Sequence, residues 1–121
     1  MKYLFIINDA PYGTEKAYNA FRLAMALQKE PSSGGEDNEV RIFLMADAAT
    51  CAIPNQVTPS GYYNIERMLK SVILKGGQVK ICGTCADARG IKNMQLIEGA
   101  ELSTMAELAS WATDSDKVLT F

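Results

Sequence analysis

Two short apolar runs with an amphipathic segment between them dominate the first third of the chain. Residues 3–8 and 40–46 are almost continuously apolar, which is typical of strands buried on both faces of a sheet. Between them, apolar residues recur at helical spacing after Thr14, a residue type that can cap a helix start. Two buried strands joined by a helix favour a βαβ unit with parallel strands. The pattern therefore predicts an α/β fold.

The remaining segments continue this alternation. In chain order the pattern predicts a polar loop at 47–60, a helix at 62–75, a strand at 78–82, a helical turn at 87–89, a strand at 100–102, a helix from 105 and a strand at 118–121. Thr104 and Glu107 have the spacing of a capping box at the start of the last helix. We expect that helix to direct Met105, Leu108, Ala109 and Ala112 inward.

Chain length and charge restrict the classes of protein. A chain of 121 residues is expected to form one domain over residues 1–121. Twelve Lys and Arg against fourteen Asp and Glu leave a net charge of −2, so no basic excess attracts nucleic acid or anionic lipid. The longest uncharged stretch, residues 48–65, contains two prolines and a glycine, which a membrane-spanning helix would not tolerate together. We therefore expect a soluble protein whose partners include neither nucleic acid nor a membrane.

The set of reactive side chains narrows the chemistry further. The chain has no histidine, which excludes Ser-His-Asp and Cys-His nucleophile activation and His-ligated metal sites. Its three cysteines are too few for a disulfide-stapled secreted domain, so we expect a reducing, cytoplasmic location. Neither GxGxxG nor GxxxxGK[ST] occurs, and a single CxxC is weak evidence for zinc. We expect no cofactor and no metal.

One motif carries chemistry, the CGTC sequence at 82–85, which begins where the third predicted strand ends. Open α/β sheets bind ligands at the carboxyl edge of their strands, so both thiols are expected at that edge. Without histidine, the groups that can hold a thiolate are backbone N–H groups at a following helix start and the guanidinium of Arg89. The predicted catalytic residues are therefore Cys82, Cys85 and Arg89.

Other residues are secondary candidates. Asp9 and Asp47 follow the first two strands, so we group them with Tyr12 and Gly13 of the first turn as pocket-binding residues, although an Asp in this position is more often a turn former. Cys51 is interpreted as a loop thiol outside the site. Cys82 itself could equally be a small buried apolar residue that ends a strand.

Segments along the whole chain resemble the DsrE/DsrF-like family, and within it the YchN-like proteins. The resemblance is carried by APYGT at 10–14, IFLMADA at 42–48, GYYNI at 61–65, ICGTC at 81–85, Asp87, Arg89-Gly90 and DKVLTF at 116–121. It implies a three-layer α/β/α fold with a five-stranded parallel sheet of order 4-3-2-1-5, and a homo-oligomer, either trimer or hexamer. It also implies sulfur relay, because the family includes subunits that carry a persulfide on the cysteine after the third strand. Cys82 matches that cysteine, and Arg89-Gly90 matches the basic-Gly pair that follows it.

The expected function is therefore that of a sulfurtransferase or persulfide carrier, with donor and acceptor proteins as partners. Cys85 stands where relay subunits typically have a non-thiol residue. A thiol there could discharge a Cys82 persulfide as sulfide and leave a disulfide, or serve as a second carrier. Two alternatives stay open: an oligomeric protein that binds a small ligand without catalysis, and a dithiol redox protein that cycles through a Cys82–Cys85 disulfide.

Overall fold

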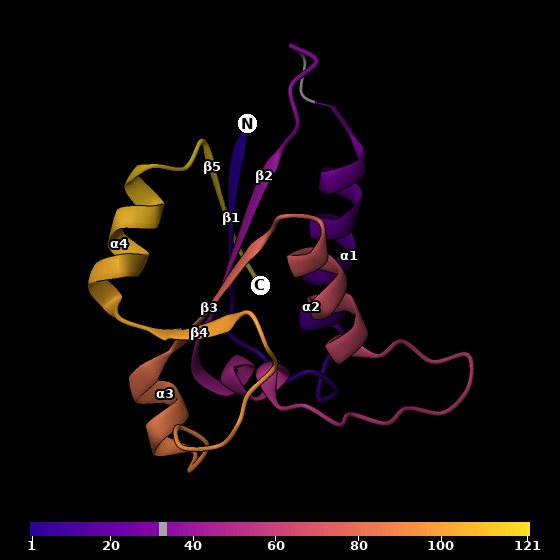
Figure 1. The fold of residues 1–121 in the computed structure, drawn as a ribbon, viewed down its shortest axis with the longest axis vertical. Coiled ribbons are helices and arrows are strands. Elements are labelled where there is room, and N and C mark those ends of the chain that lie inside the picture. Colours follow the sequence, from indigo (N-terminus) through magenta and orange to yellow (C-terminus); the bar gives the residue numbers. More distant parts are fainter. Residues whose placement is uncertain (32–33) are drawn as a thin grey trace.

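A computed structural model describes residues 1–31 and 34–121. The described residues form, in chain order, β1 (Lys2–Ile7), α1 (Lys16–Lys29), β2 (Glu39–Leu44), the 3₁₀ helix η1 (Ala46–Ala52), α2 (Ile65–Leu74), β3 (Gln78–Cys82), α3 (Gly83–Ala88), β4 (Ala100–Ser103), α4 (Met105–Thr113) and β5 (Lys117–Thr120) (Figure 1). Within these residues, no helix combines the length and apolar character that crossing a membrane requires.

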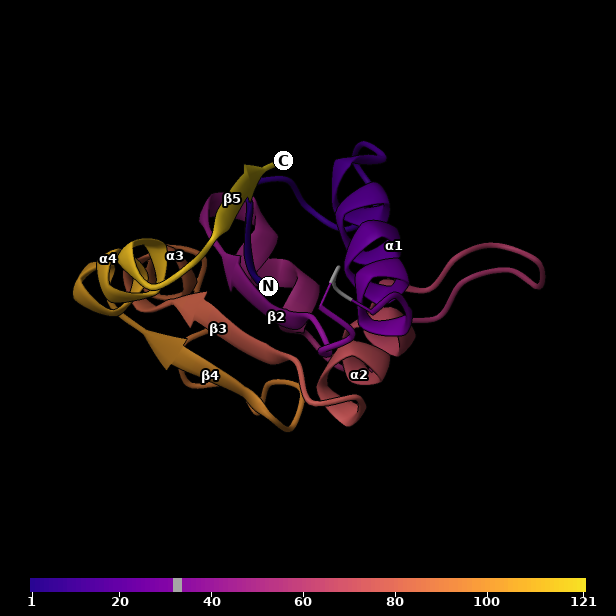
Figure 2. The ribbon, with the colours of Figure 1, turned by 90° about the horizontal axis from the view of Figure 1, so that it is seen from above.

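The strands form one parallel sheet in the order β4-β3-β2-β1-β5. Helices α1 and α2 cover one face, whereas α4 covers the other with α3 beside it (Figure 2). This confirms the predicted three-layer fold and strand order. Because all strands run in the same direction, the carboxyl ends of β1 to β4 meet along one edge of the sheet.

Alternation along the strands decides which face each side chain joins. On β2, Ile42 and Leu44 belong to the core beneath α1 and α2, whereas Phe43 belongs to a smaller core beneath α4. On β3, Ile81 lies in the larger core and Cys82 in the smaller one. The parity of β3 therefore directs Cys82 to the α4 side of the sheet.

The helices on the larger core start later than the sequence predicts. Glu15, not Thr14, is the N-cap of α1, although the Thr14 hydroxyl still accepts a hydrogen bond from the Lys16 N–H at 3.3 Å. Helix α2 begins at Ile65 rather than at residue 62, because the Asn64 side chain accepts the Arg67 N–H and caps the helix there. It ends at Leu74, one residue before the predicted 75, and the chain turns at the predicted Gly76, whose φ of 91° glycine adopts without strain.

The loop predicted over 47–60 is wrong in its first half. Residues 46–52 form η1, whose Ala48, Ala49, Cys51 and Ala52 are fully buried. Small side chains let this turn pack closely on the core, where the Ala48 N–H bonds to the Asn8 carbonyl at 3.2 Å. The chain is irregular only after Ala52, and there it extends away from the body before α2 (Figure 1).

Two predictions in the last third also need correction. The helical turn expected at 87–89 begins directly after Cys82, as α3. On α4, Met105 is 63% exposed and Ala109 is exposed, whereas Leu108 and Trp111 are buried. The buried face is set by the Trp111 ring, which meets Phe43 edge to face with centroids 6.2 Å apart.

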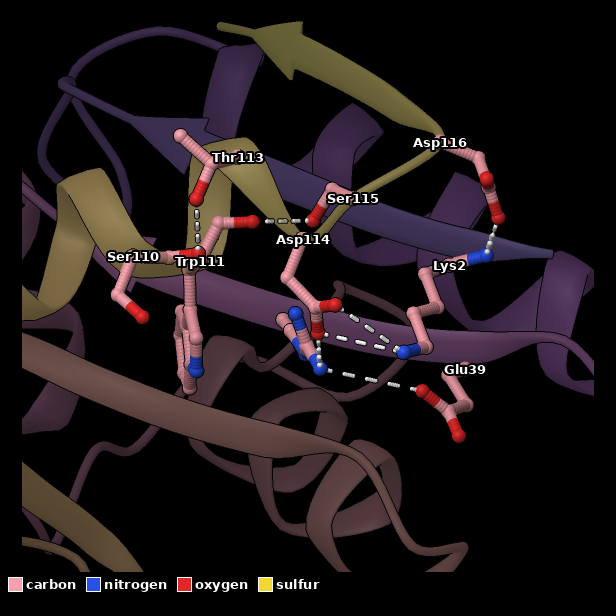
Figure 3. A network of polar contacts seen from close by, with 9 residues as sticks. Lys2, Glu39, Ser110, Trp111, Thr113, Asp114, Ser115 and Asp116 are labelled. Carbon is pink, nitrogen blue, oxygen red and sulfur yellow. Dashed lines mark hydrogen bonds and ion pairs between the residues drawn. The ribbon is translucent and has the colours of Figure 1, made fainter.

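A polar network ties the end of α4 to the sheet (Figure 3). The Asp114 carboxylate accepts hydrogen bonds from Arg41 of β2 at 2.8 Å and from Lys2 of β1 at 3.2 Å, and these bonds lower the pKa of Asp114. Asp116 accepts the backbone N–H of Lys2 at 2.7 Å. The guanidinium of Arg41 also lies 5.7 Å from the centre of the Trp111 ring. This network holds α4 over the smaller core that contains Cys82.

Candidate functional site

Cys82 and Cys85 lie together at the carboxyl edge of the sheet. Cys82 is the last residue of β3 and the N-cap of α3, and Cys85 lies in the first turn of that helix. Their Cα atoms are 5.2 Å apart, which is within the range for bridged cysteines, and their sulfur atoms form a disulfide. Gly83 makes the turn next to β4, where an added Cβ would lie 3.1 Å from the Ser103 carbonyl oxygen. The CGTC segment therefore positions both sulfurs for exchange with each other.

The two sulfurs have different surroundings. Cys82 is 8% exposed, and its Sγ lies 3.3 Å from the Thr84 hydroxyl and accepts the Cys85 N–H at 3.3 Å. The Cys85 Sγ accepts the N–H of Ala46, at the start of η1, at 3.2 Å. Each sulfur thus has an N–H donor of its own, and the second donor comes from the end of a neighbouring strand.

A pocket of about 580 Å³ opens beside Cys82 on the α4 side of the sheet edge. Its lining residues are Phe43, Met45, Cys82, Gly83, Thr84, Lys92, Leu102, Ser103, Thr104, Met105 and Glu107. The volume is in the usual range for small-molecule sites, and an apolar wall with a few polar groups is typical of them. Among the described residues, Cys82 is the one thiol that lines it.

The polar side of this pocket carries both signs of charge. Lys92 contributes an ammonium group, and Glu107 contributes a carboxylate that accepts a hydrogen bond from Ser103 and pairs with Lys80 at 3.6 Å. These contacts, the Ser103 bond first, lower the pKa of Glu107. Glu107 is therefore ionised at neutral pH and offset by Lys80, which leaves Lys92 as the cation of the lining. In residues 1–31 and 34–121, no three His, Cys, Asp or Glu side chains gather so that they could hold a metal ion.

Arg89 and Asp47 form an ion pair next to Cys85. The guanidinium donates to the Asp47 carboxylate through Nε at 2.9 Å and Nη2 at 2.8 Å, and to the Cys85 carbonyl through Nη1 at 3.1 Å. Neither residue is part of the pocket lining. Arg89 thus links η1, which begins at Ala46, to Cys85, whose sulfur accepts the Ala46 N–H.

The structure places the other three proposed pocket residues elsewhere too. Asp9 accepts a hydrogen bond from the Thr14 hydroxyl at 2.7 Å, and Gly13 has open space around it. The Tyr12 hydroxyl donates to Gln56 at 2.6 Å and accepts the Ile65 N–H at 3.1 Å, while partial burial raises the pKa of Tyr12. The Tyr12 contacts join the first turn to the start of α2, and none of the three residues lines the Cys82 pocket.

Cys51 lies outside the site but is not a loop thiol. It is fully buried in η1, and burial raises the pKa of its thiol to about 12. Its Sγ is 3.9 Å from the Asp9 carbonyl oxygen. The Cys51 side chain therefore fills the larger core.

The sequence profile of the DsrE/DsrF-like family matches residues 1–121. The chain belongs to this family. Protein YchN of Escherichia coli K12 is 43% identical over 99% of this chain and 98% of YchN. The uncharacterized protein MJ0989 of Methanocaldococcus jannaschii is 43% identical over the full length of both chains. The DsrE/DsrF-like family is associated with sulfur relay, which agrees with the expected class of chemistry.

Solved structures agree with the family assignment. The crystal structure of the YchN protein from E. coli has a TM-score of 0.90 at 43% identity and covers 100% of this chain and 99% of that chain. A conserved protein of Bacteroides thetaiotaomicron, BT1422, has a TM-score of 0.60 at 13% identity over 98% of this chain and 94% of its own. The second likeness concerns the fold alone.

Sequence reasoning missed several groups around the two cysteines. Met45 and Ala46 follow β2, Ser103 is the last residue of β4 and Thr104 follows it, so all four lie where strands end on the same edge as Cys82. The rule that led to the CGTC motif applies equally to these positions. It did not find them because methionine, alanine, serine and threonine are residue types that do not by themselves indicate a catalytic site.

Proposed function

We propose that this protein carries sulfur as a persulfide on Cys82. The observation that supports this most directly is that Cys82 ends β3 and lines the pocket, while a hydroxyl and an N–H lie 3.3 Å from its sulfur. Membership of a family associated with sulfur relay supports the same chemistry. Cys82 is the nucleophile because Cys85 is not part of the pocket lining.

In the loading step, the Cys82 thiolate attacks the terminal sulfur of a donor persulfide. A new S–S bond forms, the donor S–S bond breaks, and the donor departs as a thiolate. The negative charge on Cys82 before attack is stabilised by the Cys85 N–H and the Thr84 hydroxyl, and Lys92 supplies positive potential to the pocket.

In the transfer step, the thiolate of an acceptor attacks the outer sulfur of the Cys82 persulfide. The acceptor gains the sulfur, and Cys82 returns as a thiolate, so the cycle needs no external oxidant or reductant. Between loading and transfer, the apolar wall of Phe43, Met45 and Leu102 limits the access of water to the persulfide.

Mass spectrometry of the intact protein tests the loading step. The fully reduced protein is incubated with glutathione persulfide, and we expect a mass increase of one sulfur atom in Cys85→Ser, in which no second thiol of the motif can remove the added sulfur. The Cys82→Ser variant should lose this increase, whereas Cys51→Ala, which changes a cysteine outside the pocket, should keep the behaviour of the wild type. Equal sulfur uptake by Cys82→Ser and Cys85→Ser would remove Cys82 from the proposed role.

A dithiol redox function is a second candidate, favoured by the disulfide between Cys82 and Cys85. It predicts a reversible two-electron titration of the pair without transfer of any sulfur. The Cys85→Ser variant separates the two functions, because it keeps persulfide loading in a relay protein and abolishes all activity in a dithiol protein.

We further propose that the protein acts as a cytoplasmic homo-oligomer, a trimer or a hexamer. Exposed apolar side chains support assembly: Leu102 is 41% exposed, Met105 63% and Val118 45%. Analytical ultracentrifugation of the wild type and of Met105→Glu tests this. A single-chain mass for the wild type at micromolar concentration would contradict it.

A further inference from the structure

We propose that Cys85 is a resolving thiol that attacks the Cys82 persulfide, so that the protein also converts donor persulfide to free sulfide. This inference rests on the proposed persulfide at Cys82. It adds a second product, hydrosulfide, and a second co-substrate class, a dithiol reductant that restores the two thiols.

The first support is the fixed approach of the two cysteines. The turn at Gly83 and the start of α3 hold the Cα atoms 5.2 Å apart with the sulfurs bonded, so no rearrangement of the backbone is needed to reach the disulfide product. A persulfide on Cys82 has room for its outer sulfur in the pocket, whereas Cys85 lies outside the pocket lining. The inner sulfur is therefore accessible to Cys85 while the outer sulfur lies in the pocket.

The second support is a separate donor for Cys85. The Ala46 N–H lies 3.2 Å from the Cys85 Sγ, and Ala46 has a φ of 49°, a conformation that residues other than glycine rarely adopt. The flanking backbone holds it there, since the Met45 N–H bonds to the Ile7 carbonyl and the Ala48 N–H to the Met45 carbonyl, both at 2.8 Å. Strained residues of this kind gather at functional sites. An N–H aimed at the sulfur favours the thiolate that an attack requires.

The third support is an ion pair that fixes the Ala46 N–H relative to the Cys85 sulfur. Asp47 directly follows Ala46, and Arg89 bonds at once to the Asp47 carboxylate and the Cys85 carbonyl. Arg89 therefore acts as a positioning residue, which keeps the Ala46 N–H over the Cys85 sulfur. Its guanidinium does not reach the pocket lining, so it has no direct role in loading.

The atoms and electrons of the resolving step balance with the two cysteines and a dithiol reductant. The Cys85 thiolate attacks the inner sulfur of the Cys82 persulfide, a Cys82–Cys85 bond forms, and the bond to the outer sulfur breaks. That sulfur takes the electron pair and leaves through the pocket as hydrosulfide. A dithiol reductant then reduces the disulfide to two thiols and is itself oxidised to a disulfide.

Sulfide release and retained persulfide are measured together to test the inference. Reduced protein, freed of reductant, receives one equivalent of glutathione persulfide, after which sulfide is assayed and the intact mass recorded. The wild type should release sulfide and end as the disulfide, lighter by two hydrogens than the reduced chain. Cys85→Ser and Cys85→Ala should keep the added sulfur and lose the burst of sulfide, and Cys51→Ala should match the wild type.

The outcomes separate the two proposals. Retention of the added sulfur by the wild type and by Cys85→Ser alike, without a sulfide burst, overturns the resolving role and leaves relay by Cys82 standing. Failure of both Cys85 variants to take up sulfur overturns the persulfide on Cys82, and the resolving role with it.

The role of Arg89 has its own readout. In Arg89→Ala the rate of the sulfide burst should fall while the rate of sulfur loading stays that of the wild type, and Arg89→Lys should restore part of the burst. A general structural defect would slow both steps together. Equal burst rates for Arg89→Ala and the wild type would overturn the positioning role.

Discussion

Replacement of Trp111 by alanine tests whether the smaller core holds α4 over the site. Trp111 is 8% exposed and packs in one cluster with Leu4, Phe43, Cys82 and Leu108. Its ring meets Phe43 edge to face, and the Lys80 ammonium lies 4.8 Å from its centre. Trp111→Ala removes these contacts at once and leaves a void between α4 and the sheet.

The size of the expected effect follows from this burial. Truncation of a buried aromatic side chain to alanine costs about 3–5 kcal/mol, and the near-complete burial of Trp111 places the loss near 4 kcal/mol. Trp111→Phe keeps a ring against Phe43 and should cost only about 1–2 kcal/mol. Small domains have a free energy of unfolding of about 5–15 kcal/mol, so the alanine variant should stay folded but with a much lower denaturation midpoint.

Urea denaturation followed by far-UV circular dichroism measures these differences, because the substitution removes the one tryptophan of the chain. Ser110→Ala is the matched control: Ser110 lies on the same helix and is exposed, so this change should alter stability by no more than about 0.5 kcal/mol. Alkylation of Cys82 in the reduced protein should also become faster in Trp111→Ala. A loss below about 1 kcal/mol for Trp111→Ala, or an equal loss for both variants, would refute the assigned role of this cluster.

Three further predictions concern the larger core and its surroundings. The Cys51 thiol, whose pKa burial raises to about 12, should resist iodoacetamide in the native reduced protein and react only in urea; labelling of the native protein, read from its intact mass, would contradict this. A hydrogen bond from Lys70 is the main contact that lowers the pKa of Glu66 below its ordinary 4.5, so Glu66 stabilises the fold above that pH and loses this contribution as the pH falls through its folded pKa. Glu66→Gln should therefore lower the urea midpoint at neutral pH by more than in acid, and a difference that does not vary with pH would count against the ion pair. In Gly77→Ala the new Cβ would lie 2.5 Å from Val72 Cγ1 and 2.7 Å from the Val72 carbonyl oxygen. This overlap should lower the free energy of unfolding by about 1–3 kcal/mol, measured by thermal unfolding. An unchanged melting temperature would show that the backbone at this turn shifts without cost.

The local pattern of the sequence was sufficient for the class of fold and for the place of Cys82. Strand β3 has the predicted bounds 78–82, because a short apolar run next to a double glycine leaves few other structures for the chain. A motif that follows such a strand lies at the carboxyl edge whatever the details of packing, so the two thiols were placed correctly at that edge. The strand order came from the family resemblance, since periodicity does not report which strands are neighbours.

Contacts between distant segments depended on the tertiary structure. Ala46 donates to Cys85 across 39 positions of sequence, and Asp47 meets Arg89 across 42, and neither pairing leaves a local signal. Residues 47–60 taken together look polar enough for a loop, yet the small side chains of 46–52 pack into the core once β1 and η1 are side by side. Asp9 and Tyr12 follow a strand on the same edge, but Asp9 bonds to Thr14 before α1 and Tyr12 bonds to the start of α2. The direction of each connection, and not the end of the strand, decides which face its side chains join.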